Sequence, residues 1–191
     1  FLILYTDLGG VLRKLLLLLI TSLAFSTVTD IDGNVYETVI IGDQLWMAEN
    51  LKVTHYRNGD EIPTGYSNDD WSNLSTGAYV VYDDDPSNAE IYGNLYNWYA
   101  IDLETGVCPE DWHVPTDGEY TELSDYLGGE SVAGAKLKEC TLGSCPESDY
   151  WNSPNTGTTN ESGFTGLPGG YRNYYGGYYL GMGYYGYFWS S

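Results

Sequence analysis

The stretch that constrains the fold most strongly is CPEDWHVPTDGEYTELSDYL, residues 108–127. Thr116 follows a proline and precedes Glu119 by three positions, which is the capping box of a helix N-terminus. Apolar residues then recur at helical spacing. The stretch therefore predicts an amphipathic helix over residues 116–127.

The two faces of this helix differ in composition. Tyr120, Leu123 and Leu127 form the side that is expected to pack on the core, whereas the acidic residues face solvent. A glycine pair at 128–129 ends the helix, because glycine readily adopts the left-handed conformation of a helix C-cap. A short second helix is expected over residues 131–139.

Upstream, residues 27–41 read TVTDIDGNVYETVII and predict a β-hairpin with Asp-Gly in its turn. The acidic residues of this turn also suggest a calcium loop of the EF-hand type. Such a loop would require Gly and Glu where this chain has Val35 and Ile41. The turn is therefore the preferred interpretation.

Between the hairpin and the helix, the expected elements are short. Residues 78–82 (AYVVY) predict a strand, and the aromatic run 91–100 predicts a buried strand or a short helix. The acidic residues Asp83 to Asp85, with Glu90, are a second calcium candidate. A solvated turn is the preferred interpretation of this cluster.

The C-terminal part combines a polar stretch with a Gly/Tyr tract. Residues 151–167 show neither a helical nor an alternating pattern, and residues 169–191 read GGYRNYYGGYYLGMGYYGYFWSS. The tract is either a low-complexity segment or a set of strands and turns in which glycine permits close packing of rings. We prefer the folded interpretation, because the tract directly follows a domain with ordered elements.

The N-terminal segment has the pattern of a secretory signal peptide. Residues 11–26 read VLRKLLLLLITSLAFS, with basic residues, an apolar run too short to span a membrane, and small residues for cleavage. We expect residues 1–26 to be a signal peptide with upstream translated residues, and residues 27–191 to be the exported domain. No membrane insertion is expected after removal of the signal; retention of the segment is the alternative.

The charge balance restricts the partners. The 191 residues include 7 Lys and Arg against 27 Asp and Glu, a net charge of −20 at pH 7. Such a chain is poorly suited to the phosphates of a nucleic acid or to an anionic membrane surface. Cations, neutral glycans and proteins remain as candidate partners.

The three cysteines lie in the part that is expected to be exported, where disulfides form. Cys140 and Cys145 enclose the short loop TLGS and are expected to form a local disulfide. Cys108 is then the odd cysteine of the three, without a partner for a second disulfide.

Five motifs follow one another along the chain, at residues 27–63, 92–100, 108–129, 151–172 and 186–191. Together they resemble the Fibrobacter succinogenes major paralogous domain, over about residues 27–191. The resemblance implies an exported domain at a bacterial surface and no particular reaction. Members of that family continue beyond the motif GYFWSS. The resemblance therefore implies a C-terminally incomplete domain whose missing Cys would pair with Cys108.

The segment WHVPTDGEYTEL, residues 112–123, is also similar to a helix of the formylglycine-generating enzyme family, and GGYR and GYFWSS are similar to its closing strands. This more distant resemblance implies an α+β domain of the C-type-lectin-like class, with short twisted strands and one or two helices. The enzyme depends on a C-terminal pair of copper-binding cysteines, and neither Cys140 nor Cys145 occupies a matching position. We therefore do not infer its activity.

Motifs for catalysis are few. The two histidines, His55 and His113, are expected to have structural roles, and carboxylate pairs at a glycosidase spacing would arise by chance among so many acids. The sequence has no Gly-rich phosphate loop before a helix and no Cys-x-x-Cys metal site. We expect no catalytic residues, and no cofactor other than calcium as a candidate.

A ligand site is expected where the Gly/Tyr tract meets the polar stretch, because long loops over a lectin-like sheet carry recognition. Amide and carboxylate oxygens suit sugar hydroxyls or a calcium ion. The alternative is that these side chains only close turns. The candidate ligand-binding residues are Asn152, Asn155, Asn160, Glu161, Tyr171, Arg172 and Trp189.

The expected function is that of a noncatalytic module, secreted or at the cell surface, that binds a glycan or a surface protein through exposed Tyr and Trp. A structural subunit of a surface fibre or matrix, formed by self-assembly, is the alternative. An enzyme with a lectin-like fold is the third hypothesis.

Overall fold

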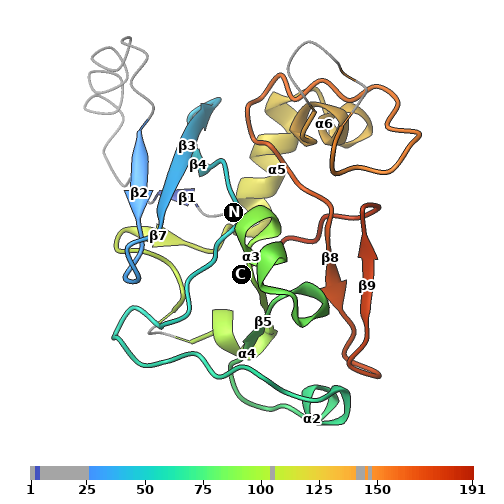
Figure 1. The fold of residues 1–191 in the computed structure, drawn as a ribbon. Helices are drawn as coiled ribbons and strands as arrows, with labels where there is room; N and C mark the ends of the chain where they lie inside the picture. Colours follow the sequence, from blue (N-terminus) through green and yellow to red (C-terminus); the bar gives the residue numbers. More distant parts are fainter. Residues whose placement is uncertain (1–2, 5–25, 104–105, 141–144, 146–147) are drawn as a thin grey trace.

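The computed structural model describes residues 3–4, 26–103, 106–140, 145 and 148–191 (Figure 1). The expected signal peptide lies almost entirely outside these described residues. Within them, no helix combines the length and apolar character that crossing a membrane would need.

The largest sheet has five strands in the order β2-β3-β4-β1-β7, and each adjacent pair is antiparallel. The strands are β1 (Ile3–Leu4), β2 (Thr27–Thr29), β3 (Val35–Ile41), β4 (Gln44–Met47) and β7 (Trp112–His113). The hairpin that the sequence predicts over residues 27–41 is confirmed by the pairing of β2 with β3.

One face of the hairpin is buried, which explains the alternation in its sequence. In β3, Tyr36 and Thr38 are buried, whereas Val35 and Glu37 are exposed. The buried face contributes to the main core cluster, which joins the sheet to later segments of the chain. This cluster consists of Tyr36, Met47, Leu51, Val53, Tyr56, Ile62, Ala100, Val107, Cys108 and Trp112.

The helix that the capping box predicts is α5 (Asp117–Tyr126), and the second predicted helix is α6 (Glu130–Leu137). The capping box is complete: Glu119 N donates to Thr116 Oγ1 at 3.2 Å, and Thr116 N donates to the Glu119 carboxylate at 2.8 Å. A second core cluster joins both helices to the sheet. It consists of Ile41, Trp46, Leu123, Leu127, Ala133 and Phe164.

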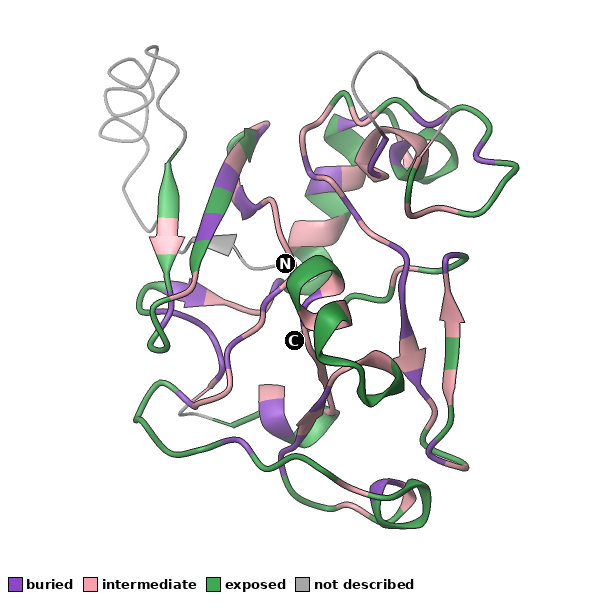
Figure 2. Cartoon of the chain, viewed as in Figure 1, coloured by how far each residue is buried: buried purple, intermediate pink, exposed green. Residues whose placement is uncertain are grey.

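The region between β4 and β7 is built from short elements. They are α2 (Asn68–Ser72), β5 (Tyr79–Val80), the 3-10 turn η1 (Tyr82–Asp84), α3 (Pro86–Tyr92), β6 (Leu95–Tyr96) and α4 (Trp98–Ile101). The strands β5 and β6 pair as a small antiparallel sheet. The helix α3 contributes no buried residue, as Figure 2 shows.

Two expectations for this region were wrong. The strand expected over residues 78–82 is only two residues long, because η1 follows it. The run 91–100 is not one element, because it includes the end of α3, all of β6 and part of α4. The chain turns at Gly93, where a Cβ atom would lie 2.7 Å from the Leu51 carbonyl oxygen, and again at Asn97, whose side chain caps α4.

The Gly/Tyr tract is folded, as the sequence analysis preferred. The strands β8 (Gly169–Arg172) and β9 (Tyr179–Met182) form an antiparallel hairpin at one side of the molecule (Figure 1). Glycine is required where backbones approach closely, since a Cβ atom on Gly170 would lie 2.5 Å from the Leu180 carbonyl oxygen. With small antiparallel sheets and short helices, the described part of the chain is an α+β protein.

Candidate functional site

A cleft of about 420 Å³ lies where β8 and the C-terminal segment meet the region between β4 and β7. Its lining is mainly aromatic and aliphatic and includes a few polar groups, which is the usual composition of a ligand pocket. The aromatic residues of the lining are Trp71, Tyr92, Tyr96, Tyr171, Tyr174, Tyr187, Phe188 and Trp189.

The indole of Trp189 is fixed in position although it is 45% exposed. Its Nε1 donates to the Tyr96 carbonyl oxygen at 2.9 Å, and its ring packs against Trp98 with 5.7 Å between centroids. A ring that is already ordered loses little conformational entropy when a ligand stacks on it.

Four rings of the lining, those of Tyr171, Tyr187, Phe188 and Trp189, form what we call the aromatic wall. Tyr171 of β8 and Tyr187 meet edge to face, with 4.8 Å between centroids, and Tyr187 is more than half exposed. Phe188 makes an edge contact with the buried ring of Phe164 at 5.8 Å. The wall therefore consists of rings that are anchored in the protein and also accessible to solvent.

Two asparagines stabilise the backbone beside the aromatic wall. Asn50 Nδ2 donates to the Tyr92 carbonyl oxygen at 2.8 Å, and Asn94 Nδ2 donates to the Lys52 carbonyl oxygen at 3.0 Å. These bonds hold the chain around α3 and β6 against the segment that follows β4.

Arg172, the last residue of β8, lines the cleft and is only 8% exposed. One edge of its guanidinium group is held by three acceptors. Nε donates to the Gly177 carbonyl oxygen at 2.8 Å, and Nη2 donates to the Tyr66 carbonyl oxygen at 2.9 Å and to Asn68 Oδ1 at 3.1 Å.

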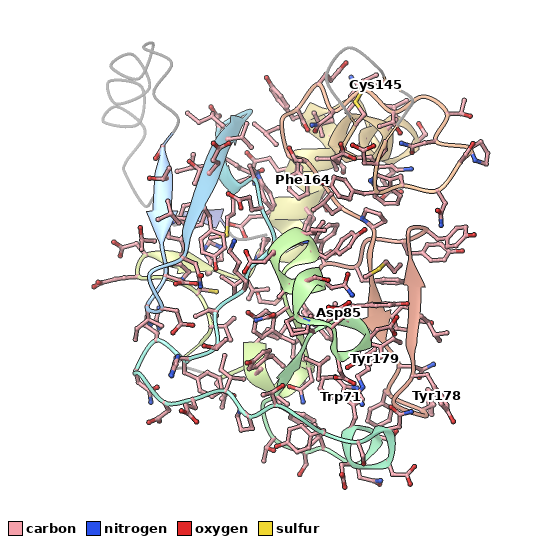
Figure 3. The ribbon with its side chains drawn as sticks, viewed as in Figure 1. Trp71, Asp85, Cys145, Phe164, Tyr178 and Tyr179 are labelled. Atoms are coloured by element: carbon pink, nitrogen blue, oxygen red, sulfur yellow. A yellow bond between two sulfur atoms is a disulfide. The ribbon has the colours of Figure 1, made fainter. Side chains whose placement is uncertain are left out.

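The same guanidinium contacts two aromatic rings. Its central carbon lies 4.8 Å from the ring centroids of both Trp71 and Tyr179, which Figure 3 shows close together beside the β8–β9 hairpin. Its Nη1 atom is buried and has no hydrogen-bond partner in the described part of the chain. Arg172 is thus a buried cation that is oriented by neutral groups.

Of the seven candidate ligand-binding residues, Tyr171, Arg172 and Trp189 line the cleft. The other four, all from the polar stretch, are not part of the lining: Asn152, Asn155, Asn160 and Glu161.

The polar stretch instead makes bonds within the protein. The Oδ1 atoms of Asn155 and Asn160 each accept a hydrogen bond from a nearby threonine, and Glu161 pairs with a lysine of α6 at 2.8 Å. Asn152 N donates to the Gly183 carbonyl oxygen, so the stretch does touch the Gly/Tyr tract. Ligand or calcium binding by these residues stays a prediction.

Both histidines contact carboxylates rather than the cleft. His55 Nδ1 lies 2.5 Å from Asp32, and His113 Nε2 lies 3.0 Å from Glu119. Burial alone would raise the pKa of Glu119, but hydrogen bonds from Thr116 and His113 outweigh it and lower the pKa. Among the described residues, no three His, Cys, Asp or Glu side chains are grouped as a metal site would require.

The predicted disulfide between Cys140 and Cys145 is present, with the two Cα atoms 5.5 Å apart. Cys108 is a free, buried thiol, and burial raises its pKa to about 12. Such a thiol stays protonated at neutral pH and is a poor nucleophile.

The side of the cleft that lies before β7 contains none of the residues that were candidates from the sequence. Trp71, Tyr92 and Tyr96 line it. The aromatic run 91–100 was the available signal, but aromatic residues on both faces were interpreted as burial. The same pattern arises when one of the faces lines a cleft.

A family model described as Fibrobacter succinogenes major domain matches residues 39–191, which is most of the chain. The family is one of unknown function. Comparison with curated proteins gave no match, and neither did comparison with solved structures.

Proposed function

The chain belongs to the Fibrobacter succinogenes major domain family, and we propose that it is a noncatalytic module that binds a glycan in its aromatic cleft. The observation that supports this most strongly is the set of anchored, partly exposed rings around Trp189 and Tyr187. Tyr and Trp offer large contact areas with a polar edge, which suit the apolar faces and the hydroxyls of a sugar. The cleft volume of about 420 Å³ lies in the range of small-ligand pockets.

The absence of catalysis is part of the proposal. The side chains with the greatest catalytic potential are engaged elsewhere, since His55 and His113 pair with carboxylates and the Cys108 thiol is buried. The cleft lining offers neither histidine nor cysteine among the described residues. Binding without reaction is therefore the simplest role for this cleft.

We also propose that the domain acts outside the cell and has a C-type-lectin-like fold. The Cys140–Cys145 disulfide is compatible with an oxidising compartment. The mixed α and β content is compatible with the lectin-like class, which the similarity of residues 112–123 suggested.

Titration calorimetry of the purified protein tests the glycan proposal. The panel contains neutral hexose, pentose and N-acetylhexosamine oligomers together with galacturonate oligomers. At least one is expected to bind, and Trp189→Ala is expected to weaken that binding at least about tenfold, because it removes an interface anchor.

Tyr126→Ala is the matched control, because Tyr126 is 66% exposed on α5 and does not line the cleft. This variant should bind as the unchanged protein does. Equal losses in both variants, or no binding by any member of the panel, would contradict the proposal.

A second candidate is self-assembly into a surface fibre or matrix. It is favoured by exposed tyrosines outside the cleft, of which Tyr175 at the end of the β8–β9 hairpin is 92% exposed. Sedimentation velocity over a hundredfold range of protein concentration distinguishes the two. Concentration-dependent polymers without glycan binding would support assembly, and a constant monomer would exclude it.

A further inference from the structure

We infer that the glycan bound in this cleft carries a carboxylate group, as a uronic acid does, and that Arg172 pairs with it. The inference rests on the proposed function and names its substrate class.

The charge of the cleft is opposite to the charge of the chain. The chain has 27 acidic residues, yet no Asp or Glu is part of the cleft lining in the described part of the molecule. The charged residue of the lining is Arg172, one of only 7 basic residues. A site with this lining favours an anionic group, although the net charge of the whole molecule is −20.

Arg172 has unused hydrogen-bonding capacity. Its Nη1 is buried without a hydrogen-bond partner, and the described residues provide no salt bridge to its guanidinium group. A buried donor that lacks a partner is unfavourable, and a buried charge is more so. Nη1 is enclosed by protein atoms, so a carboxylate in the cleft reaches it once a neighbouring side chain shifts. The carboxylate then supplies both the acceptor and the counter-charge in one charge-assisted bond.

The guanidinium is also oriented before any ligand arrives. The acceptors on Nε and Nη2 hold one edge, and Trp71 and Tyr179 contact the planar group. The free donor therefore belongs to a group with restricted rotation. In this arrangement the aromatic wall stacks against the sugar ring, and Arg172 binds its carboxylate.

The negative charge of the remaining surface limits the length of the ligand. At physiological ionic strength, charges in solvent are screened beyond about 8 Å. A short oligouronide therefore experiences mainly the local cationic group, whereas a long polyuronate also meets the acidic surface. The ligand class is thus a mono-, di- or trisaccharide with one or a few carboxylates.

The test compares galacturonate trisaccharide with its fully methyl-esterified form by titration calorimetry of the purified protein. The ester keeps the sugar ring and removes the charge. The acid is expected to bind at least about tenfold more tightly, because charge-assisted hydrogen bonds are about twice as strong as neutral ones. Equal affinity, or tighter binding of the ester, would overturn the inference and leave the proposed function standing.

Two variants locate the effect. Arg172→Gln is expected to remove the preference for the acid, and Arg57→Gln, which removes the same charge from an exposed position, is expected to keep it. An equal loss of preference in both variants would mean that the charge of the molecule, not the cleft, sets the preference, and would refute the inference.

If circular dichroism shows that Arg172→Gln does not fold, the comparison of acid and ester on the unchanged protein decides. Binding of neutral glycans alone rejects this inference only, whereas no glycan binding rejects the proposed function as well.

Discussion

Asp30 organises the first hairpin through its side chain. Its carboxylate accepts hydrogen bonds from Asp32 N at 3.0 Å, from Asn34 N and Nδ2 at 2.9 and 2.8 Å, and from the Tyr36 hydroxyl at 2.6 Å. Burial raises the pKa of Tyr36, and the neighbouring Asp30 adds to the increase, so the phenol remains a donor. The Asp30 carboxylate thus ties the turn backbone to the buried face of the hairpin.

Asp30→Ala is therefore expected to destabilise the protein by about 2–3 kcal/mol, because the buried Tyr36 hydroxyl and the turn amides lose a charged acceptor. Urea denaturation measures the change. Asp43→Ala, at an exposed position in the next turn, is the control and should have little effect. If Asp30→Ala lowers the free energy of unfolding no more than the control does, the hydrogen bonds of Asp30 do not stabilise the hairpin.

At the scale of single residues, the spacing of residues predicted the features that depend on neighbours in the sequence, such as turns. The Asp-Gly turn signal predicted the hairpin that the pairing of β2 with β3 confirms. The contact of His55 with Asp32, 23 positions away, could not be predicted, because no local pattern reports which loops a fold brings together.

The helix α5 is the element whose packing the sequence defines best. Leu123 is 2% exposed and contacts the cluster around Trp46 and Phe164. Leu123→Ala is expected to reduce the free energy of unfolding by about 2–5 kcal/mol, because it leaves a cavity in a close-packed core. Glu122→Ala, on the exposed face, should change it little. Chemical denaturation checks both, and similar values for the two would mean that the buried face is misassigned.

The capping box makes the stability of α5 depend on pH. The pKa of Glu119 is lowered in the folded protein, because hydrogen bonds from Thr116 and His113 outweigh the effect of burial. The charged form therefore stabilises the fold above the usual Glu pKa of 4.5, and this contribution is lost as the pH falls through the lower folded value.

Glu119→Gln is accordingly expected to cost about 1 kcal/mol at neutral pH. The difference in unfolding free energy between the unchanged protein and the variant should be full above about pH 6 and shrink below pH 4.5. Urea denaturation at a series of pH values measures it, with Glu122→Gln as control. A difference that stays constant down to pH 3 would contradict this role of Glu119.

Elements with a local signal were predicted, and elements without one were not. The capping box and the glycine pair gave α5 and α6 nearly to the residue. The run 91–100 was predicted as one element, but the chain turns within it at Gly93. The cause of this turn is the close approach of the Leu51 backbone, which is distant in the sequence and leaves no local signal. The N-cap at Asn97 was hidden in a row of aromatic residues.

At the scale of the whole molecule, the cleft is assembled from segments between Asn50 and Trp189. Tyr171, Arg172 and Trp189 could be predicted from the sequence, because the Gly/Tyr tract stands out by composition. The surface opposite them could not, because the length of the polar stretch was the only local signal for it. The net charge of the chain did not predict the charge of the cleft, because the acidic residues are not distributed evenly and none of those in the described part of the chain lines it.

The most direct test of the cleft as the binding site is a titration of the six tryptophan indole N–H signals by nitrogen-15 NMR, with the glycan that binds in calorimetry. Trp71 and Trp189 line the cleft, whereas Trp46 and Trp112 are core residues and Trp151 is the first residue of the polar stretch. We expect the Trp71 and Trp189 signals to shift with the binding curve and those of Trp46, Trp112 and Trp151 to stay in place. A shift of Trp151 with an unchanged Trp189 would move the site to the polar stretch and contradict the cleft.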